Sequence, residues 1–180
     1  MDLIEALDQT FQHAQGVIGN VRPDQYDDPT PCPDWAVRDL LSHTIGVVAG
    51  LGSAAAGTPP TEFVLGHDPA SQFREAAAAT LAAWRAPGVL DRVVDGGPGP
   101  MPGRVLAGIN LLDTATHTWD IAAATGQPTE LPAGVAEAAL GASRATISSE
   151  IRPGRFAAEV AAPPGAGPTE RLVAFLGRQA

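Results

Sequence analysis

The sequence predicts an all-α domain built as a four-helix bundle with long connections. The chain is 44% hydrophobic but only 5% aromatic, and alanine-rich runs such as residues 75–81 favour helices over strands. Near the N-terminus, apolar residues recur at helical spacing, at Leu3, Leu7, Phe11, Ala14 and Ile18. A length of 180 residues suits one domain with a sizeable core, so residues 1–180 are expected to form a single unit.

Capping and turn residues place the helices along the chain. The four main helices are expected at residues 2–19, from 34–36 to 53, at 68–86 and at 103–125. Asp68 followed by Pro69 is typical of an N-cap and a first helical position, and Gly126 with Pro128 beyond it is typical of a helix end. The remaining chain is expected to hold a short extended piece within 89–94, a helix over 133–150 and a short closing helix over 168–177.

Charge and cysteine content exclude some classes of partner. The formal net charge is −9 and no run of basic residues exists, so binding to nucleic acid or to an anionic membrane surface is not expected. The acidic start at Met1–Glu5 does not resemble a signal peptide, and no run reaches the ~18 apolar residues of a membrane helix. Cys32 is the single cysteine, which excludes an intrachain disulfide and fits a reducing cytoplasm.

The expected fourth helix carries polar residues on an otherwise apolar face. Leu106 and Ala124 mark the apolar ends of this face, and its middle holds Asp113, His117 and Asp120. Burying such groups without partners is costly, and carboxylates are rarely buried unpaired. Something must therefore compensate these side chains, and a metal ion is one candidate.

The spacing of these residues suits two ligands of one ion. Asp113 and His117 are four residues apart, so their Cβ atoms lie about 5–6 Å from each other on a helix. Zinc accepts imidazole nitrogen and carboxylate oxygen, and catalytic zinc sites typically combine three protein ligands with an open position. The third ligand must come from a facing helix, and His43 is better placed than His13 or His67.

The residues alone leave a second interpretation open. Asp113 and His117 would then form a buried ion pair, with Asp120 beside them, that serves structure only. Cys32 is expected to be structural as well, buried near Trp35.

Three segments resemble the N-terminal domains of the mycothiol-dependent maleylpyruvate isomerases, which belong to the DinB-like superfamily of metal-binding four-helix bundles. The first two segments are TPCPDWAVRDLLSH at residues 30–43 and HTWDIAAATG at residues 117–126. The third, RLVAFLGR at residues 171–178, is similar to the end of a short, single-domain branch of that group. Together they imply the same bundle fold over nearly the whole chain.

The resemblance also implies a site and an activity. In that family a histidine late in the second helix and a pair four residues apart on a later helix hold the metal, which here gives His43, Asp113 and His117. The implied ion is zinc, with nickel as the second option, and mycothiol is the implied co-substrate. The enzyme would use the metal-bound thiolate to attack a small electrophilic substrate, giving S-transfer or isomerisation. Asp120 would be a base or a residue that supports a metal ligand, or equally a partner of an arginine or of nearby backbone.

The sequence departs from the isomerases in three places. They carry glutamate where this chain has Asp113, and they have a second, C-terminal domain that these 180 residues do not contain. Many relatives have a serine- or threonine-type helix cap where this chain has Ala36, which leaves Asp34 as the expected cap.

Two other functions therefore stay open. The first is metal-assisted hydrolysis by bound water, and the second is a non-catalytic metal-binding or sensing bundle, with a homodimer as one form. A fourth protein ligand would favour the non-catalytic function, and the sequence offers only Asp120 for that position.

Overall fold

The computed structural model describes residues 1–96 and 99–178, and it confirms the all-α fold with a minor strand pair. The elements in chain order are α1 (Leu3–Gly19), a 3-10 turn (Pro23–Gln25), α2 (Val37–Ala56), α3 (Pro69–Trp84), β1 (Val93–Asp95), β2 (Pro100–Pro102), α4 (Gly103–Ala124), α5 (Ala133–Thr146) and α6 (Pro168–Phe175).

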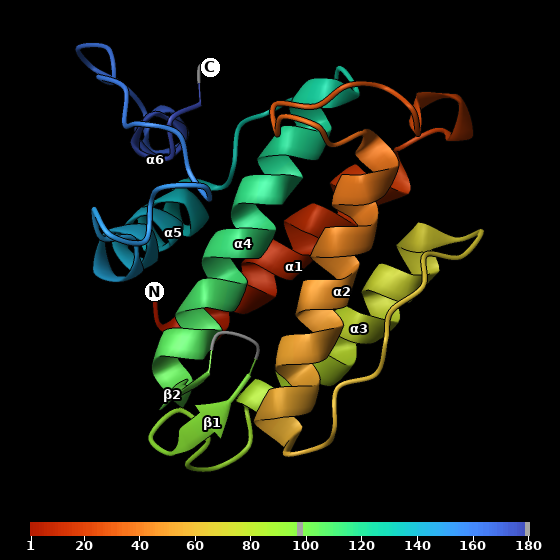
Figure 1. Ribbon diagram of the computed structural model, residues 1–180, viewed down its shortest axis with the longest axis vertical. Coiled ribbons are helices and arrows are strands. Elements are labelled where there is room, and N and C mark those ends of the chain that lie inside the picture. Colours follow the sequence, from red (N-terminus) through yellow and green to blue (C-terminus); the bar gives the residue numbers. More distant parts are fainter. Residues whose placement is uncertain (97–98, 179–180) are drawn as a thin grey trace.

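Helices α1 to α4 form the bundle, in which α1 and α2 each lie beside both α3 and α4. Helix α5 packs on α4 and α6 packs on α5, so these two cover the side of α4 that faces away from α2 (Figure 1). The strands β1 and β2 form a small antiparallel hairpin directly before α4. As a result, α4 is enclosed on both sides, which explains why polar residues along it are buried.

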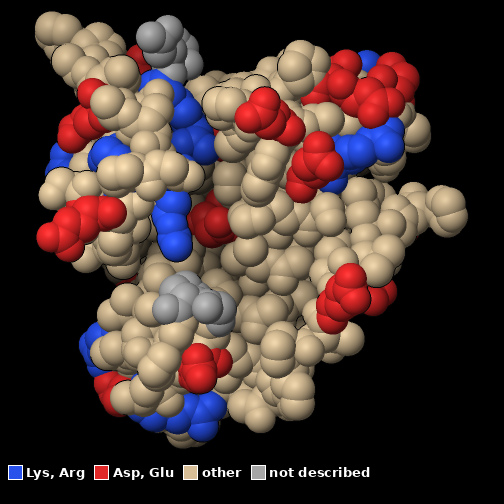
Figure 2. Space-filling model, in the orientation of Figure 1, with Lys and Arg blue, Asp and Glu red and all other residues tan. Residues whose placement is uncertain are grey.

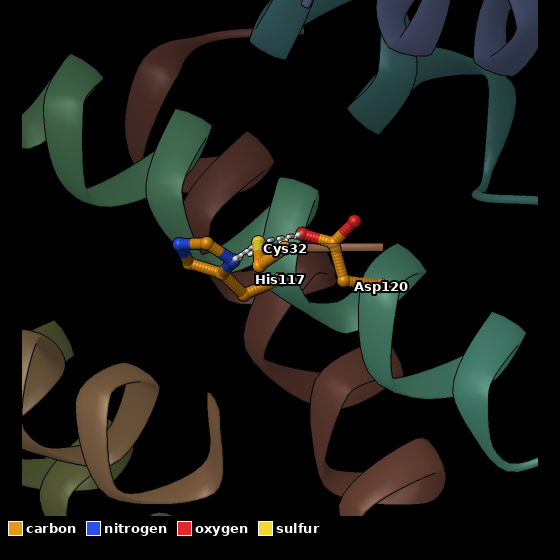
Figure 3. Close-up of side chains that lie close together, drawn as sticks. All are labelled: Cys32, His117 and Asp120. Atoms are coloured by element: carbon orange, nitrogen blue, oxygen red, sulfur yellow. Dashed lines mark hydrogen bonds and ion pairs between the residues drawn. The ribbon is translucent and has the colours of Figure 1, made fainter. Parts of the chain in front are cut away.

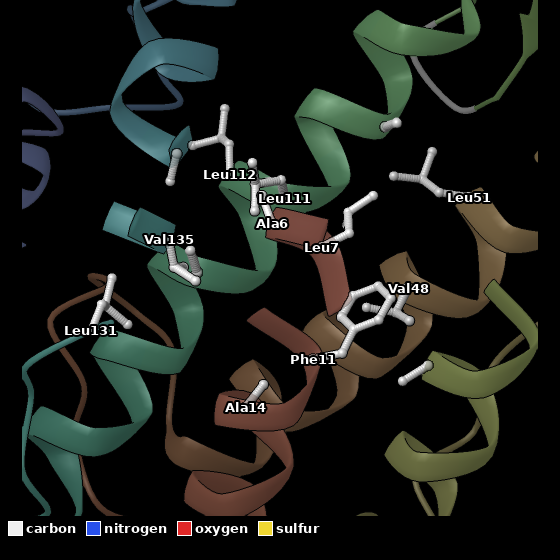
Figure 4. Packing of buried hydrophobic residues seen from close by; sticks show 14 of the residues in the cluster. Ala6, Leu7, Phe11, Ala14, Val48, Leu51, Leu111, Leu112, Leu131 and Val135 are labelled. Atoms are coloured by element: carbon white, nitrogen blue, oxygen red, sulfur yellow. The ribbon is translucent and has the colours of Figure 1, made fainter. Parts of the chain in front are cut away.

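The core lies between the four bundle helices and continues between α4 and α5 (Figure 4). Phe11 of α1 meets Phe73 of α3 edge to face, with ring centroids 6.1 Å apart. The predicted stripe of α1 is confirmed at four of its members, because Leu7, Phe11, Ala14 and Ile18 are buried. This packing, rather than intrinsic helix propensity, gives most of the stability of such helices.

The structure confirms one of the two predicted N-cap residues and contradicts the other. The Asp68 side chain accepts a hydrogen bond from Ser71 N at 2.9 Å, as its N-cap role predicts. The expectation that Asp34 caps α2 is wrong, because Asp34 adopts a positive φ of 67° two residues before the cap position. Ala36 is the N-cap, and its N–H donates to the side chain of Asp39 at 2.9 Å.

Two further boundaries differ from the prediction. Helix α5 ends at Thr146 rather than near residue 150, because the chain turns at Ser148, whose backbone carbonyl and hydroxyl both accept from Ile151 N. The extended piece expected within 89–94 is β1 (Val93–Asp95). The strand begins near the end of the expected range and shares only residues 93 and 94 with it.

A glycine is needed where α4 begins. A Cβ on Gly103 would lie 2.1 Å from the carbonyl oxygen of Val89, so a larger residue would push the hairpin off the helix. At the other end Gly126 follows α4 with φ of 68°, the left-handed conformation that its predicted role requires. Within the described residues, the helices all lack the combination of length and apolar character needed to cross a membrane.

Candidate metal centre

The structure brings the three predicted ligands together between α2 and α4. His43 Nε2 lies 3.2 Å from Asp113 Oδ1, and His117 Nε2 lies 3.6 Å from the same oxygen. One ligand atom from each of the three residues lies within 4.8 Å of the others. The residues are half-buried, so the group is sheltered but reachable from solvent.

The donor atoms fit a tetrahedral ion. Zinc–ligand bonds of about 2.1 Å at the tetrahedral angle place neighbouring donor atoms roughly 3.4 Å apart, between the two distances observed here. Asp113 Oδ2 is buried, and among the described residues it has no hydrogen-bond partner. Such an orphaned carboxylate oxygen is costly unless a cation compensates it. The observed geometry therefore suits a divalent ion better than a closed network of hydrogen bonds.

Asp120 lies on the Nδ1 side of the His117 ring (Figure 3), whereas Asp113 lies on its Nε2 side. Its Oδ2 is 3.0 Å from His117 Nδ1, so Nδ1 is engaged while Nε2 points toward Asp113. Asp120 is fully buried, and Arg178 donates to both of its oxygens at 2.7 Å. A buried carboxylate on the outer nitrogen of a ligating histidine is the usual arrangement around metal sites.

Cys32 packs against the core and also contacts His117, Asp120 and Arg178. Its Sγ lies 3.4 Å from Asp120 Oδ2 and 4.0 Å from His117 Nδ1, and Arg178 donates to it at 3.5 Å (Figure 3). Burial raises the pKa of the Cys32 thiol to about 11, and the negative charge of Asp120 adds to this effect. The thiol is therefore protonated at neutral pH and donates to Asp120, which argues against a nucleophilic role.

Two other groups near the cluster have shifted pKa values. Burial lowers the pKa of His43, but the hydrogen bond and the charge of Asp113 outweigh burial and leave the pKa above its ordinary value. Burial likewise raises the pKa of Asp120, and here the His117 and Arg178 contacts outweigh it, so the pKa is lowered. Asp120 is thus an ion-paired carboxylate at neutral pH, which makes it a poor general base.

Trp35 forms one wall of the site. Its ring centroid lies 4.8 Å from that of His43 and 6.0 Å from that of His117, and the residue is 37% exposed. From there a groove of about 740 Å³ runs along α2 past Gly46 and Gly50. Its other lining residues are Asp34, Asp39, Ser42, Val47, Pro60, Thr61 and Phe63. A small molecule in this groove would reach the exposed edge of His43.

Sequence reasoning missed two residues of the site. Arg178 was part of a quoted motif but had no assigned role, and Trp35 was expected only as a neighbour of Cys32. Both could be found only from the tertiary structure, because Arg178 and Asp120 are 58 positions apart. His13 and His67 lie outside the two potential metal-binding groups found among the described residues.

Arginine side chains on the face shown in Figure 2 form small separate groups, and several of these lie beside carboxylates. This distribution matches the acidic balance of the chain, with 20 acidic and 11 basic residues.

The fold and the site together define a helical bundle with a His–Asp–His cluster that suits a divalent metal ion. A family model described as the mycothiol maleylpyruvate isomerase N-terminal domain matches residues 7–122. The chain belongs to this family. The predicted resemblance is thereby confirmed.

The chain is also similar to two uncharacterized proteins and to one solved structure. Uncharacterized proteins from two strains of Mycobacterium tuberculosis are 37% identical over 181 residues, which cover 99% of this chain and 98% of theirs. A solved structure titled as the mycothiol-dependent maleylpyruvate isomerase matches with a TM-score of 0.50 and 15% identity. That match covers 79% of this chain and 68% of the other, and at this identity it shows a shared fold only.

Proposed function

We propose that this protein binds one divalent metal ion through His43, Asp113 and His117 and uses it to activate a low-molecular-weight thiol. The convergence of three ligand atoms from two helices, with Asp113 Oδ2 unpaired among the described residues, carries the proposal. Zinc is the proposed ion and nickel the second choice, because imidazole and carboxylate ligands suit both. When bound, such an ion acts as a Lewis acid that lowers the pKa of a thiol or water in contact with it.

The protein's own residues divide the remaining tasks. His43 and His117 each present Nε2 toward Asp113, and the ring of Trp35 shelters the two imidazoles from one side. Asp120 is directed toward His117 Nδ1 and Arg178, so its carboxylate supports a ligand instead of adding a fourth one. Three protein ligands leave room for an exogenous group, which is the arrangement of catalytic rather than structural zinc sites.

Family membership supports a proposal for the co-substrate and the reaction. We propose mycothiol as the thiol and a small electrophile as its target, in an S-transfer or isomerisation carried out in the cytoplasm. The thiol has to come from outside the chain, because Cys32 is the single cysteine and its pKa is about 11. The groove along α2 would hold the larger of the two reactants, since the groove opens directly beside His43.

Metal analysis of the purified protein tests the first half of the proposal. The wild type should retain about one equivalent of zinc or nickel, and the Asp113→Ala/His117→Ala double variant should retain none. A folded wild type that refuses added zinc would refute the metal centre and the enzyme hypothesis with it.

Turnover of electrophiles with mycothiol tests the second half. Product formation should require both the thiol and the metal, should vanish in His43→Ala, and should persist in His67→Ala, which removes an exposed histidine. Turnover without any thiol would indicate metal-assisted hydrolysis instead. If the metal-loaded protein converts neither an electrophile nor an ester, the result would favour a non-catalytic metal-binding role.

A further inference from the structure

Arg178 forms an unusually well-buried ion pair at the end of the described chain. Its side chain is 12% exposed and that of Asp120 is fully buried, and Nε and Nη2 reach separate carboxylate oxygens at 2.7 Å each. This is the parallel, two-bond geometry that a guanidinium makes with a carboxylate and that a lysine cannot reproduce. The pair joins Arg178, three residues beyond the end of α6, to the C-terminal part of α4.

Fastening the C-terminal segment does not account for this pair. Helix α6 is already held by the buried side chains of Leu172 and Leu176, and Arg152 donates to the carbonyl of Phe175 at 3.0 Å. Removing two charges from water costs free energy, and the attraction between the charges only partly compensates this cost. A buried ion pair is therefore an inefficient way to stabilise the packing of a segment. A more specific role for the guanidinium is therefore expected.

The position of the guanidinium points to that role. Cys32, His117 and Asp120 form a second group whose ligand atoms lie within 4.8 Å of one another, on the Nδ1 side of His117. Arg178 Nη2 lies 2.7 Å from Asp120 Oδ2 and 3.5 Å from Cys32 Sγ, so it already supplies the positive charge that this group needs. A metal ion is thereby directed to the opposite, Nε2 side of the ring.

We propose that Arg178 is a positioning residue of the metal centre. Its two hydrogen bonds fix the plane of the Asp120 carboxylate, and Asp120 then holds His117 with Nδ1 protonated and Nε2 free to bind the ion. The C-terminal segment thus completes a site whose ligands all come from α2 and α4. This inference rests on the proposed metal-binding function, which it extends to a residue that does not itself touch the ligands.

The inference is tested with Arg178→Ala and Arg178→Lys, and with Arg171→Ala as a matched control. Arg171 lies in α6, and its exposed side chain has a 3.8 Å contact with Glu137 as its single ion pair among the described residues. Zinc affinity is measured by competition with a chelating dye. Loss of a hydrogen-bonding partner behind a metal ligand weakens binding by about 10–100-fold, so about tenfold is expected for Arg178→Ala. Arg178→Lys should fall between that variant and the wild type, and Arg171→Ala should match the wild type.

A second measurement does not depend on the metal. In the metal-free protein, long-range proton–nitrogen NMR correlations of ¹⁵N-labelled histidines identify which ring nitrogen of His117 carries the proton. The wild type should show Nδ1–H, whereas Arg178→Ala should show a mixture that includes Nε2–H, because Asp120 is then free to turn. If Arg178→Ala does not fold, the smaller change in the same direction is expected in Arg178→Lys and decides the question.

Three results would overturn the inference. The first is an unchanged zinc affinity and an unchanged His117 tautomer in a folded Arg178→Ala protein. The second is an equal loss of affinity in Arg171→Ala, which would indicate general loosening of α6. The third is an unchanged His117 tautomer in Arg178→Ala when the wild type binds no zinc, because the metal proposal has then failed by itself and the tautomer alone decides the role of Arg178.

Discussion

Replacing Asp113 by asparagine separates a metal centre from a structural polar cluster. The substitution keeps the size of the side chain but removes the charge that lies 3.2 Å from His43 Nε2 and 3.6 Å from His117 Nε2. In the metal-free protein at pH 8 the loss of one hydrogen bond is partly offset, because a buried oxygen without a partner among the described residues also loses its charge. We expect the unfolding free energy to change by less than about 1.5 kcal/mol.

Zinc should make the two proteins differ strongly. At free zinc about 1,000 times the wild-type Kd, binding to the folded state adds about 4.1 kcal/mol of stability. For a chain of this size that raises the Tm by about 8–16 °C. If the asparagine variant binds zinc about 100-fold more weakly, the same zinc concentration adds only about 1.4 kcal/mol, or about 3–6 °C.

The assay is a thermal unfolding series with and without zinc, with Asp91→Asn as the control. Asp91 is an exposed carboxylate, 71% exposed at its side chain, and it lies outside the ligand cluster. Its variant should show the full wild-type shift. An equal zinc-induced shift in Asp113→Asn would refute the ligand role of Asp113, and the absence of any shift in the wild type would refute the site.

Three further predictions follow from other contacts. Because Asp113 raises the pKa of His43, zinc must displace a proton below that pKa, so competition titrations should show affinity falling about tenfold for each unit by which pH is lowered there; an affinity that does not depend on pH would contradict this. Without zinc the same pair stabilises the fold below about pH 6.5 and loses this effect as pH rises through the raised pKa; an unfolding free energy that stays constant over this range would contradict that statement. Iodoacetamide at pH 8 should alkylate Cys32 about 100-fold more slowly in the folded protein than in urea, because its folded pKa is about 11; equal rates measured by mass spectrometry would show that the thiol is neither buried nor held by Asp120. Gly52→Ala should destabilise the protein by about 1–3 kcal/mol or more in urea denaturation, since the new Cβ would lie 2.2 Å from Thr80 Oγ1 and 3.0 Å from Thr80 Cα. Gly50→Ala is the matched control, because a Cβ there would meet no atom within 4 Å. This variant should stabilise α2 by about 0.5–1 kcal/mol.

The grouping of His43, Asp113 and His117 was predictable because it depends on local periodicity. Asp113 and His117 are four residues apart, so any helix through them places both side chains on one face. His43 needed one assumption more, that its helix lies beside the other one, and a bundle of four helices makes that arrangement common. The apolar surroundings of the pair then signalled that a partner was required.

The surroundings of the cluster were not predictable for the opposite reason. Cys32 and Trp35 reach the site from an irregular loop, and Arg178 reaches it from beyond the last helix, so neither position follows from a repeat or a spacing. The failed prediction for Asp34 has the same origin. A cap is a local feature, but the positive φ of Asp34 arises within a loop whose ends are tied together by the Pro29–Ala36 bridge and by Val37 N donating to Asp28 O.

The charge of the site decides which kind of ligand it prefers. A divalent ion with two neutral imidazoles and the Asp113 carboxylate leaves a net charge of about +1, provided that no other uncompensated carboxylate lies nearby. Asp120 would cancel this charge if it stood alone, but Arg178 pairs with both of its oxygens at 2.7 Å. With the proposed ion bound, the centre would keep its positive charge, and with it a preference for an anionic group such as a thiolate. By this reasoning the arginine that orients Asp120 also removes the negative charge that would otherwise repel the thiolate.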